Sequence, residues 1–462
     1  MAERYDMNNL KGKKVLVFGA GISGTGAAEL LGRAGADVIL YDGNPSLSEQ
    51  DVREKLPAGC GAKIVLGEMP ADLAGTLDLV VLSPGVPTDL PVVNGLRDAG
   101  LPIWGEVELA YVCSRGDVLA ITGTNGKTTT TSLLGAIMRR HQPEVFVVGN
   151  IGTPYTGAAP EMTDDSVAVA EISSFQLETT HSFHPQVSAI TNITPDHLNR
   201  HHTMEEYIRV KECITMNQTP DDTCVLNYED PVLREFGESL AAQGKVKVSF
   251  FSSARRLDDG FFYEDGRIYI AEGGKAEELI AVSELKLLGV HNYENVMTAS
   301  AMAYAYGVPV DEIREVLRAF TSVEHRIEYV AEKNGVIYYN DSKGTNPDAA
   351  IRAVQAMERP TVLIGGGYDK DSSYEEWIRA FDGKVKLLVL IGATKEKIAD
   401  AARACGFTDF CFADTFEEAF EKCVEAAKPG DAVLLSPACA SWDMFKNFEV
   451  RGNVFKELVH RL

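Results

Sequence analysis

Short apolar runs rich in β-branched residues alternate with longer helical stretches along the chain. This alternation predicts an α/β fold with mostly parallel sheets. The amino-terminal runs are KKVLVFG, ADVILYD, AKIVLGE, LDLVVLSPG and PIWGE. Further runs are DVLAIT, VAVAEIS and VSAITNI, followed by GVIYYNDS, TVLIGGG, KLLVLIGA and AVLLSPA. The segment FFYEDGRIYI predicts a hairpin that turns at Asp265 and Gly266.

The pattern restarts twice, so the 462 residues are expected to form three domains. We place a Rossmann-like domain at residues 1–112, a P-loop ATPase-like α/β domain at 113–325 and a second Rossmann-like domain at 326–462. Polar motifs directly follow the apolar runs, among them GAG, SPG, TGTNGK, EISS, TPDH, NDSK and SPA. Ligands of open α/β sheets bind at the carboxyl ends of strands, so these loops predict a cleft shared by several domains.

The acidic composition narrows the classes of partner. The formal net charge is −23 and 45% of the residues are hydrophobic, which is typical of a globular protein that repels nucleic acid and anionic membranes. No apolar run reaches the roughly 18 residues of a membrane span, and the start MAERYDMNNLKGKK lacks the apolar core of a signal peptide. The eight cysteines include no C-x-x-C pair, which disfavours a zinc or iron–sulfur site. We therefore expect a cytoplasmic protein that binds neither nucleic acid nor membrane.

The segment AITGTNGKTTTT is typical of a phosphate-binding loop. Gly123 and Gly126 allow the backbone to turn N–H groups toward phosphate oxygens. Lys127 supplies a positive charge, and Thr128 supplies a hydroxyl for magnesium. Ile121 occupies the first glycine position of G-x-x-x-x-G-K-[ST], so this loop is shorter at its front than usual. The alternative is a helix N-terminus capped by threonines.

A second glycine-rich loop, GAGISG, follows the first apolar run and matches G-x-G-x-x-G at Gly19, Gly21 and Gly24. Asp42 ends the next run, near the distance expected for an acid that binds a ribose. The pattern is typical of NAD-binding domains, although the same helix N-terminus suits any nucleotide diphosphate. A tight turn without a ligand is a further alternative.

Two residues at the ends of apolar runs are candidates for a metal centre or for catalysis. Glu171 ends the run VAVAE, where its carboxylate would bind magnesium, and the alternative is an acid that caps the following helix. His197 follows Asp196 at the end of ITNITPDH, which favours a functional role over a structural one.

Lys211 lies on the apolar face of a predicted helix that opens with Thr203 and Glu206, a capping box. Its neighbours on that face are Met204, Tyr207, Ile208 and Ile214. A lysine in an apolar stripe either extends its amine to solvent or is paired or chemically modified. The pattern alone leaves these alternatives open.

Motifs along nearly the whole chain resemble those of the ATP-dependent Mur ligases. They are GTNGKTT, EISSFQLE, TPDHLNRH with Lys211 downstream, GVHNYEN, EHR, NDSKGTN and LSPACASWDMFKNFEVRG. Within the family they are similar to the enzymes that add D-glutamate to UDP-N-acetylmuramoyl-L-alanine, through an acyl phosphate, in peptidoglycan precursor synthesis. The resemblance implies that the loop GTNGKTT binds ATP and that the first glycine loop holds the UDP of the substrate.

The resemblance also assigns site residues. The UDP-substrate would be lined by Ile22, Ser23, Asp42, Gly43, Ser83, Gly85 and Asn150. ATP would contact Gly123, Thr124, Asn125, Gly126, Lys127, Thr128, Thr129, Asn292, Asn295, Arg326 and Asp341. D-glutamate would be held by Lys343, Thr345, Lys370, Ser441 and Phe448. The residues implied in catalysis are Lys127, His197, Lys211 and Arg326.

The same resemblance implies two Mg²⁺ sites, which Mn²⁺ would also suit. Thr128 and Glu171 would hold one cation, and His197 would hold the other together with a carbamate formed from carbon dioxide on Lys211. A monomer is expected. Two departures affect the assignment: Asn199 stands where relatives usually have Asp, and the loop GGGYDK that contains Lys370 varies among relatives.

Rival classes explain fewer of these motifs. An NAD(P)-dependent oxidoreductase built on the first loop leaves GTNGKTT and Glu171 unexplained. A folylpolyglutamate synthase-like ligase shares the central loop but is not expected to begin with a UDP-type segment. The ligase that adds the third, diamino residue is disfavoured by the absence of D-N-P-R. A regulator that binds ATP without catalysis would leave the acids and lysines of the motifs idle.

Overall fold

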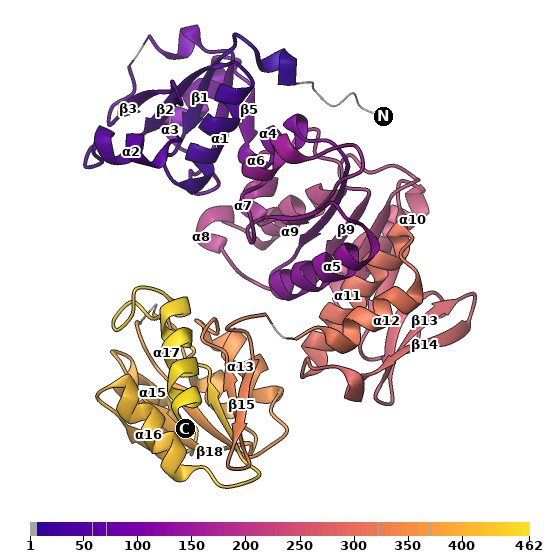
Figure 1. Ribbon diagram of the computed structural model, residues 1–462, viewed down its shortest axis with the longest axis vertical. Coiled ribbons are helices and arrows are strands. Elements are labelled where there is room, and N and C mark those ends of the chain that lie inside the picture. The colour runs from indigo at the N-terminus through magenta and orange to yellow at the C-terminus, as the bar shows by residue number, and fades with distance from the viewer. Residues whose placement is uncertain (1–6, 58, 71, 322, 370) are drawn as a thin grey trace. The chain divides into compact units, whose positions relative to one another are not determined.

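The computed structural model describes residues 7–57, 59–70, 72–321, 323–369 and 371–462 (Figure 1). The chain divides into two compact units, Met1–Val282 with Glu294–Leu317 and Ser283–Tyr293 with Arg318–Leu462. Within the described residues, no helix is long and apolar enough to cross a lipid bilayer.

The amino-terminal sheet has parallel strands in the order β3-β2-β1-β4-β5. The strands are β1 (Lys14–Phe18), β2 (Asp37–Asp42), β3 (Lys63–Leu66), β4 (Leu79–Leu82) and β5 (Ile103–Gly105). The helical segments are η1 (Met7–Leu10), α1 (Ile22–Arg33), α2 (Glu49–Lys55), η2 (Ala74–Thr76) and α3 (Pro91–Asp98). Successive residues of β1 and β4 are buried on both faces, which explains why these strands are continuous apolar runs. The five strands coincide with the five predicted runs.

The central sheet belongs to the same unit and has the strand order β14-β13-β12-β11-β10-β9-β6-β8-β7. Its strands are β6 (Asp117–Thr122), β7 (Val145–Gly149), β8 (Val167–Glu171), β9 (Val187–Ile190), β10 (Thr223–Asn227), β11 (Lys247–Ser252), β12 (Gly260–Glu264), β13 (Arg267–Glu272) and β14 (Lys275–Ala281). Pairing is parallel from β7 to β12 and antiparallel from β12 to β14. Asp265 and Gly266 form the turn between β12 and β13 with positive φ angles of 46° and 77°, which confirms the predicted hairpin.

Helices connect the two sheets of the first unit. The helical segments between residues 106 and 319 are α4 (Glu106–Cys113), α5 (Lys127–His141), α6 (Tyr155–Ala158), η3 (Ala159–Glu161), α7 (Ser174–Leu177), α8 (Leu198–His201), α9 (Met204–Glu212), η4 (Cys213–Thr215), α10 (Pro231–Gln243), η5 (Val282–Glu284), α11 (Val290–Tyr306) and α12 (Val310–Ala319). Helix α4 packs against both α1 and α6. One continuous hydrophobic core therefore extends from Val15 of β1 to Val118 of β6.

The second unit has one sheet, with the order β15-β16-β20-β17-β18-β19. Its strands are β15 (Glu328–Lys333), β16 (Val336–Asn340), β17 (Thr361–Gly365), β18 (Val385–Leu390), β19 (Phe410–Phe412) and β20 (Ala432–Leu435). Its helices are α13 (Pro347–Gln355), α14 (Glu375–Arg379), α15 (Lys395–Ala404), α16 (Phe416–Ala426) and α17 (Phe448–Arg461). The edge strand β15 is antiparallel to β16 and the other pairs are parallel. The predicted α/β class with mostly parallel sheets is confirmed, while the domain boundaries near residues 112 and 325 stay a prediction.

Several strands were not singled out from the sequence. They are β7, β10, β11 and β14 of the central sheet and β15 and β19 of the second unit. Four of them, β7, β14, β15 and β19, are the edges of their sheets. The edge strands β14 (KAEELIA) and β15 (EYVAEK) carry charged residues that limit pairing with other chains, and they therefore lack a continuous apolar run. The apolar edge strands β7 (VFVVG) and β19 (FCF) are only five and three residues long.

The contact between Gly24 and Gly19 generates a prediction about stability. A Cβ at Gly24 would lie 1.7 Å from the carbonyl oxygen of Gly19, so helix α1 approaches the loop after β1 without room for a side chain. We expect Gly24→Ala to lower the free energy of unfolding by about 1–3 kcal/mol through overpacking, measured by thermal and denaturant unfolding.

Gly32 on the same helix is the matched control, because a Cβ there meets no atom within 4 Å. Gly32→Ala should raise stability by roughly 0.5–1 kcal/mol, since alanine is the better helix former. Equal unfolding midpoints for the two variants would contradict this account of the loop.

Candidate functional site

A cavity of about 780 Å³ lies in the first unit between loops of the amino-terminal and central sheets. The expected UDP-substrate residues that line it are Ile22, Ser23, Asp42, Ser83, Gly85 and Asn150. Gly43 follows Asp42 in the chain but is not among the lining residues. Lys127 and His197 line the same cavity from the central domain. The structure therefore brings two separately predicted groups of residues to one space.

The first glycine loop is shaped by its contacts with neighbouring strand ends. A Cβ at Gly19, whose φ is 106°, would meet the Ser83 hydroxyl at 2.7 Å, so the loops after β1 and β4 touch at the switch point of the sheet. The Asp42 carboxylate accepts hydrogen bonds from the N–H groups of Ala20 and Asn44, both at 2.9 Å. Asp42 thus supports the loop as well as lining the cavity, whereas the sequence predicted only the ligand role.

The loop between β6 and α5 has the backbone of a phosphate-binding loop. Gly123 has a φ of 139°, and Gly126 caps α5 in the left-handed region with a φ of 86°. A Cβ at Gly126 would lie 2.3 Å from Oδ1 of Asn295, so Asn295 packs directly on the loop. The Lys127 Nζ donates to the carbonyls of Gly123 and Thr124 at 2.9 Å each. The first turn of α5, where Thr128 and Thr129 are buried, has backbone N–H groups and a positive dipole end, which are suited to an anion.

The segment after β9 supports this loop. The Asn192 carbonyl accepts the N–H of Thr124 at 2.9 Å, and its side-chain oxygen accepts the N–H of Asn125 at 3.0 Å. The Thr191 hydroxyl donates to the Asn125 carbonyl at 2.6 Å. These N–H groups serve the loop itself, which leaves phosphate contacts to the start of α5. The sequence alone indicated no role for Asn192. Its one distinguishing feature is that it follows β9, a strand that pairs with β6.

Lys211 is only 1% exposed, so its amine does not extend to solvent. Its Nζ donates to the Gly123 carbonyl at 2.8 Å and lies 4.7 Å from the ring centroid of Tyr207. Burial lowers the pKa of Lys211 well below its ordinary value, the Lys127 charge lowers it further, and Asp196 opposes both effects. Burial and the Lys127 charge both shift the amine toward its neutral form.

Glu171 ends β8 with a carboxylate that the protein satisfies incompletely. Its Oε1 accepts the side-chain amide of Asn150 at 2.7 Å, while its buried Oε2 has no hydrogen-bond partner among the described residues. Such an oxygen is costly unless a donor or a cation satisfies it. A carboxylate oxygen of this kind suits a hard divalent cation. No group of three or more His, Cys, Asp or Glu within the described ranges could hold a metal, so substrate oxygens would have to complete the coordination.

His197 begins the short helix α8 in an unusual backbone conformation. His197 has a φ of 53° and His202, just after the helix, has a φ of 67°. Left-handed conformations of residues other than glycine are costly and require support from the surrounding structure. The ring of His197 lies 4.9 Å from that of Phe175, edge to face.

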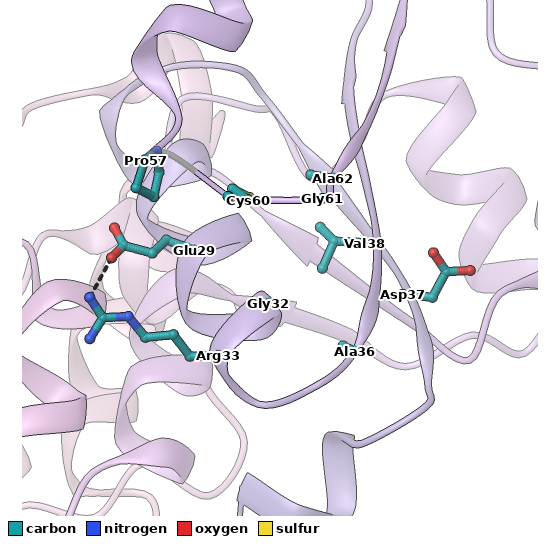
Figure 2. A pocket seen from close by; sticks show the side chains of 11 residues that line it. Glu29, Gly32, Arg33, Ala36, Asp37, Val38, Pro57, Cys60, Gly61 and Ala62 are labelled. Carbon is teal, nitrogen blue, oxygen red and sulfur yellow. Dashed lines mark hydrogen bonds and ion pairs between the residues drawn. The ribbon is translucent and has the colours of Figure 1, made fainter.

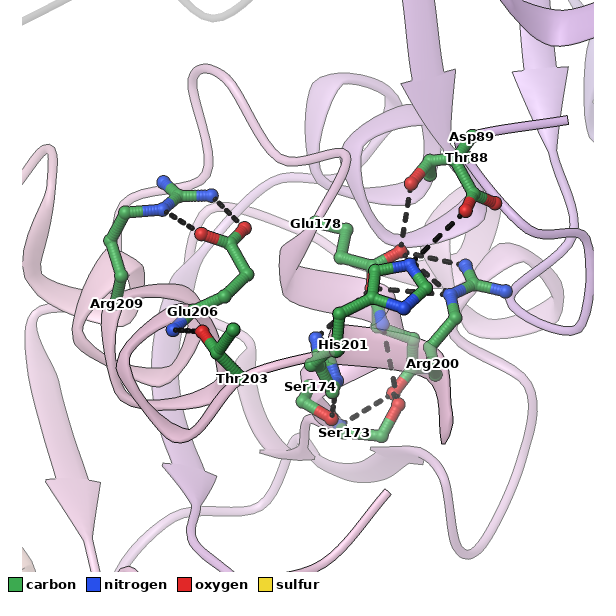
Figure 3. Close-up of polar contacts among 12 residues, drawn as sticks. Thr88, Asp89, Ser173, Ser174, Glu178, Arg200, His201, Thr203, Glu206 and Arg209 are labelled. Atoms are coloured by element: carbon green, nitrogen blue, oxygen red, sulfur yellow. Dashed lines mark hydrogen bonds and ion pairs between the residues drawn. The ribbon is translucent and has the colours of Figure 1, made fainter. Parts of the chain in front are cut away.

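That support comes from a buried polar cluster around Glu178 (Figure 3). Arg200 of α8 pairs with Glu178 at 2.6 Å and donates to the Val86 carbonyl at 3.0 Å. Glu178 also accepts the Thr88 hydroxyl at 3.3 Å and lies 3.3 Å from His201 Nδ1. The cluster links the loop after β4 to α8, so the position of His197 depends on the amino-terminal domain. Arg200 and His201 stood in the motif TPDHLNRH but were assigned no role.

The predicted capping box of α9 forms only in part. The Thr203 hydroxyl accepts the N–H of Glu206 at 3.1 Å, as expected of an N-cap. The Glu206 side chain pairs instead with Arg209 at 2.6 Å (Figure 3). An exposed arginine one turn away attracts the carboxylate away from the N-cap N–H.

In the second unit, Asp341 holds the segment around Arg326. Its Oδ1 accepts the N–H of Ile327 at 3.2 Å and its Oδ2 accepts the Ser436 hydroxyl at 2.7 Å. His325 and Ile327, on either side of Arg326, have positive φ angles of 64° and 43°. Burial raises the pKa of Asp341 to about 7. Both carboxylate oxygens therefore serve the fold, in addition to the ribose contact that the resemblance implies.

Arg451 of α17 is fully buried and joins two loops of the second unit. Its guanidinium donates to the hydroxyl and the carbonyl of Ser342, at 3.0 and 2.7 Å, and to the Cys439 carbonyl at 3.2 Å. The Ser342 hydroxyl donates in turn to the Phe448 carbonyl at 2.8 Å. Burial lowers the pKa of Arg451 to about 10, so the side chain stays charged at neutral pH. Arg451 belongs to the motif LSPACASWDMFKNFEVRG, but the sequence alone indicated no role for it.

The expected D-glutamate residues lie on the segments that this arginine joins. The Lys343 Nζ lies 5.5 Å from the ring centroid of Phe448, a cation–π distance, and the Thr345 N–H donates to the Lys343 carbonyl at 2.8 Å. Ser441 follows Cys439 closely and is 2% exposed. Lys370 lies outside the described residues.

The remaining expected ATP residues divide between the units. In the first unit, Asn295 accepts the Thr130 hydroxyl at 3.3 Å beside the ATP loop. In the second unit, Asn292 donates to the Leu288 carbonyl at 2.7 Å and thereby holds the start of α11.

A second cavity, of about 480 Å³, lies at the opposite end of the amino-terminal sheet (Figure 2). It is lined by residues at the start of β2 and in the loop before β3, and the ion pair between Glu29 and Arg33 lies at its side. None of the predicted site residues that the structure describes lines it.

Matches to known families cover the three sheets. Residues 13–105 match the Mur ligase MurD-like N-terminal domain, residues 121–303 the Mur ligase middle domain, and residues 325–439 the Mur ligase glutamate ligase domain.

Solved structures share the fold. MurF from Acinetobacter baumannii has a TM-score of 0.61 at 17% identity, with 96% of this chain and 93% of that chain covered. UDP-N-acetylmuramate-alanine ligase MurC from Thermotoga maritima has a TM-score of 0.60 at 20% identity, with 97% and 99% covered.

Sequence relatives are far more similar. The chain is 55% identical over 454 residues to a UDP-N-acetylmuramoylalanine–D-glutamate ligase from Lachnoclostridium phytofermentans, covering 98% of this chain and 99% of that protein. It is 45% identical over 455 residues to the protein of the same name from Clostridioides difficile, covering 98% and 100%. With three domain matches and full-length relatives at this identity, the chain belongs to the Mur ligase family.

Proposed function

We propose that this chain is an ATP-dependent ligase that adds D-glutamate to UDP-N-acetylmuramoyl-L-alanine in peptidoglycan precursor synthesis. The observation that carries the proposal is the shared cavity, in which Lys127 and His197 line the same space as the first glycine loop. A sugar nucleotide held by that loop would extend its carboxylate toward Lys127. The names of the full-length relatives support this pair of substrates.

The chemistry requires activation of a carboxylate, because a carboxylate anion does not accept an amine at neutral pH. Transfer of the γ-phosphoryl group of ATP to the alanyl carboxylate gives an acyl phosphate and ADP. The uncharged amine of D-glutamate then attacks the carbonyl carbon, and the C–N bond forms. The nitrogen releases a proton, and the C–O bond breaks as phosphate leaves with the electron pair and takes up a proton. Lys127 offsets the negative charge between carboxylate and γ-phosphate, and we assign Arg326 a second positive charge at the γ-phosphate.

Two divalent cations, Mg²⁺ or Mn²⁺, would supply further charge compensation to the phosphate oxygens. We assign Thr128 and Glu171 to one cation, because the buried Oε2 of Glu171 lacks a partner among the described residues. We assign His197 and a carbamate on Lys211 to the other. His197 would also orient the substrate carboxylate or the incoming amine.

Carbamylation of Lys211 is supported by the environment of its amine. The side chain is buried and its pKa is lowered well below the ordinary value, a shift toward the neutral amine that reacts with carbon dioxide. The product would be an anion whose charge attracts that of Lys127, whereas a protonated Lys211 is repelled by it.

The remaining assignments follow the family resemblance. ATP would contact residues 123–129, with Asn292, Asn295 and Asp341 toward the nucleoside. D-glutamate would bind Lys343, Thr345, Lys370, Ser441 and Phe448. Because one chain supplies all of these residues, we propose a monomer. ATP and UDP-sugars are cytoplasmic metabolites, which supports a cytoplasmic location.

Substitution of Lys127 tests the role of the ATP loop. We expect Lys127→Ala to lower ATP-dependent phosphate release by about 100-fold or more, because a charge that stabilises the transition state is lost. Binding of the UDP-substrate, measured by calorimetry, should persist. Arg139→Ala is the matched control, because Arg139 is exposed near the other end of α5.

Phosphate release should be measured with UDP-N-acetylmuramoyl-L-alanine and a panel of D- and L-amino acids. D-glutamate should support release and formation of the amide product. Undiminished release by Lys127→Ala, or a preference for another amino acid, would overturn the corresponding part of the proposal.

Isotope-labelled bicarbonate tests the carbamate on Lys211. The native protein should show a carbamate carbon signal by NMR that disappears on acid denaturation and is absent from Lys211→Met, a variant of similar length without the amine. A signal of equal strength in Lys211→Met, or no signal in active native protein, would exclude the modification.

A further inference from the structure

Glu106 is a buried acid in the wall of the substrate cavity that no motif singled out. It is the first residue of α4, immediately after β5, and its side chain is 3% exposed. It lines the cavity together with residues of the first glycine loop and with Lys127. A buried carboxylate in a space that receives an anionic substrate is electrostatically unfavourable unless it has a specific partner.

Glu108, two residues along the same helix, anchors a neighbouring backbone segment, whereas Glu106 does not. Glu108 accepts the backbone N–H groups of His181, Ser182 and Phe183 at 2.9, 2.7 and 3.2 Å, and also the Ser182 hydroxyl. Glu106 accepts one hydrogen bond from the described residues, from Gln176 Nε2 at 2.8 Å. Acceptor capacity therefore remains on Glu106.

The partner amide is held in one orientation. Gln176 Oε1 accepts the N–H of Ser173 at 2.8 Å, and because a backbone N–H can only donate, the oxygen must face Ser173 and the Nε2 must face Glu106. Gln176 also lines the cavity. Its side chain uses one of its two Nε2 protons on Glu106, so Glu106 fixes where the other proton points.

The backbone at Glu106 is equally fixed. The preceding Gly105 donates its N–H to the Thr179 carbonyl at 3.0 Å, and a Cβ there would meet the Thr179 hydroxyl at 2.2 Å. This contact joins the last strand of the amino-terminal sheet to the segment after α7. Glu106 thus stands at the junction of the two domains that line the cavity.

The position of Glu106 in the cavity determines which part of the bound substrate would lie next to it. Under the proposed function, the diphosphate is held by the amino-terminal loops and the reacting carboxylate lies near Lys127, so the N-acetylmuramoyl sugar spans the junction. Both charged ends of the substrate would repel Glu106, whereas the sugar offers neutral donors, an acetamido N–H and hydroxyls. Burial raises the pKa of Glu106, and the Gln176 hydrogen bond opposes that effect.

We propose that Glu106 is a specificity residue that accepts a hydrogen bond from a neutral N–H or O–H group of the substrate sugar and sets the orientation of the Gln176 amide beside it. The proposal rests on the proposed function for the identity of the sugar nucleotide. It predicts selection for the sugar part of the substrate, separate from recognition of the diphosphate.

Calorimetry with two probes tests the assignment, UDP-N-acetylmuramoyl-L-alanine and UDP alone. Glu106→Gln keeps the side-chain volume and the oxygen that accepts from Gln176, but places an NH₂ donor where the substrate donor would bind. We expect it to weaken binding of the full substrate by roughly tenfold to hundredfold, as for loss of a hydrogen bond to a charged group, and to leave UDP binding unchanged. Glu106→Asp, which keeps the charge, should recover part of the loss.

Glu29→Gln is the matched control, because Glu29 lies at the second cavity, away from the site. Equal losses for both probes in Glu106→Gln, or no loss for either, would overturn the proposal. If that variant fails to fold, Glu106→Asp decides, since unchanged binding of both probes by a folded Glu106→Asp would also overturn it. A further outcome is possible, in which Glu106→Gln weakens binding of the full substrate and not of UDP, but the native enzyme does not join D-glutamate. That outcome would reject the proposed function and leave Glu106 as a sugar-binding residue.

Discussion

Backbone segments meet without an intervening side chain at the carboxyl ends of the strands, and the site depends on this close approach. Gly24 lies against the Gly19 carbonyl, and a Cβ at Gly149 would lie 2.3 Å from the Glu171 carbonyl oxygen. At Gly123 the close neighbour is the Thr191 hydroxyl, 2.0 Å from where a Cβ would stand. These contacts set the spacing of the first glycine loop, the loop at Gly123–Lys127 and Glu171 at the end of β8. A side chain at any of them would move a loop rather than only fill space.

Buried charges form a second layer of organisation. Lys211, Glu171 and Arg451 are almost completely buried, and the described residues around them include no oppositely charged side chain in direct ion pairing. Arg451 is satisfied by carbonyl and hydroxyl oxygens and has a structural task, the joining of two loops. Lys211 donates to the Gly123 carbonyl of the loop between β6 and α5, and Glu171 keeps one oxygen without a partner among the described residues. Arg451 therefore stabilises the fold, whereas the environments of Lys211 and Glu171 favour modification or binding of a ligand.

The sequence predicted the buried parallel strands and the loop at Gly123–Lys127, because both depend on local patterns of apolar residues and glycines. It also predicted an unusual lysine at 211, but not whether its amine would be buried, since that depends on packing against a loop distant in the sequence. Asn192, Glu178 and Glu106 act through residues far along the chain, and no local pattern distinguishes them from other polar residues. The edge strands β14 and β15 were missed because they carry charges in place of an apolar run.

The cavity of the first unit is lined from two separate sheets, and this has a consequence for the protein in the cell. A molecule bound there contacts loops of both sheets, so its binding free energy adds to the resistance of both against unfolding. Each tenfold rise in free ligand above its dissociation constant contributes about 1.4 kcal/mol. If the cavity holds the sugar nucleotide, as proposed, a shortage of that substrate leaves the enzyme idle and at the same time more susceptible to proteases.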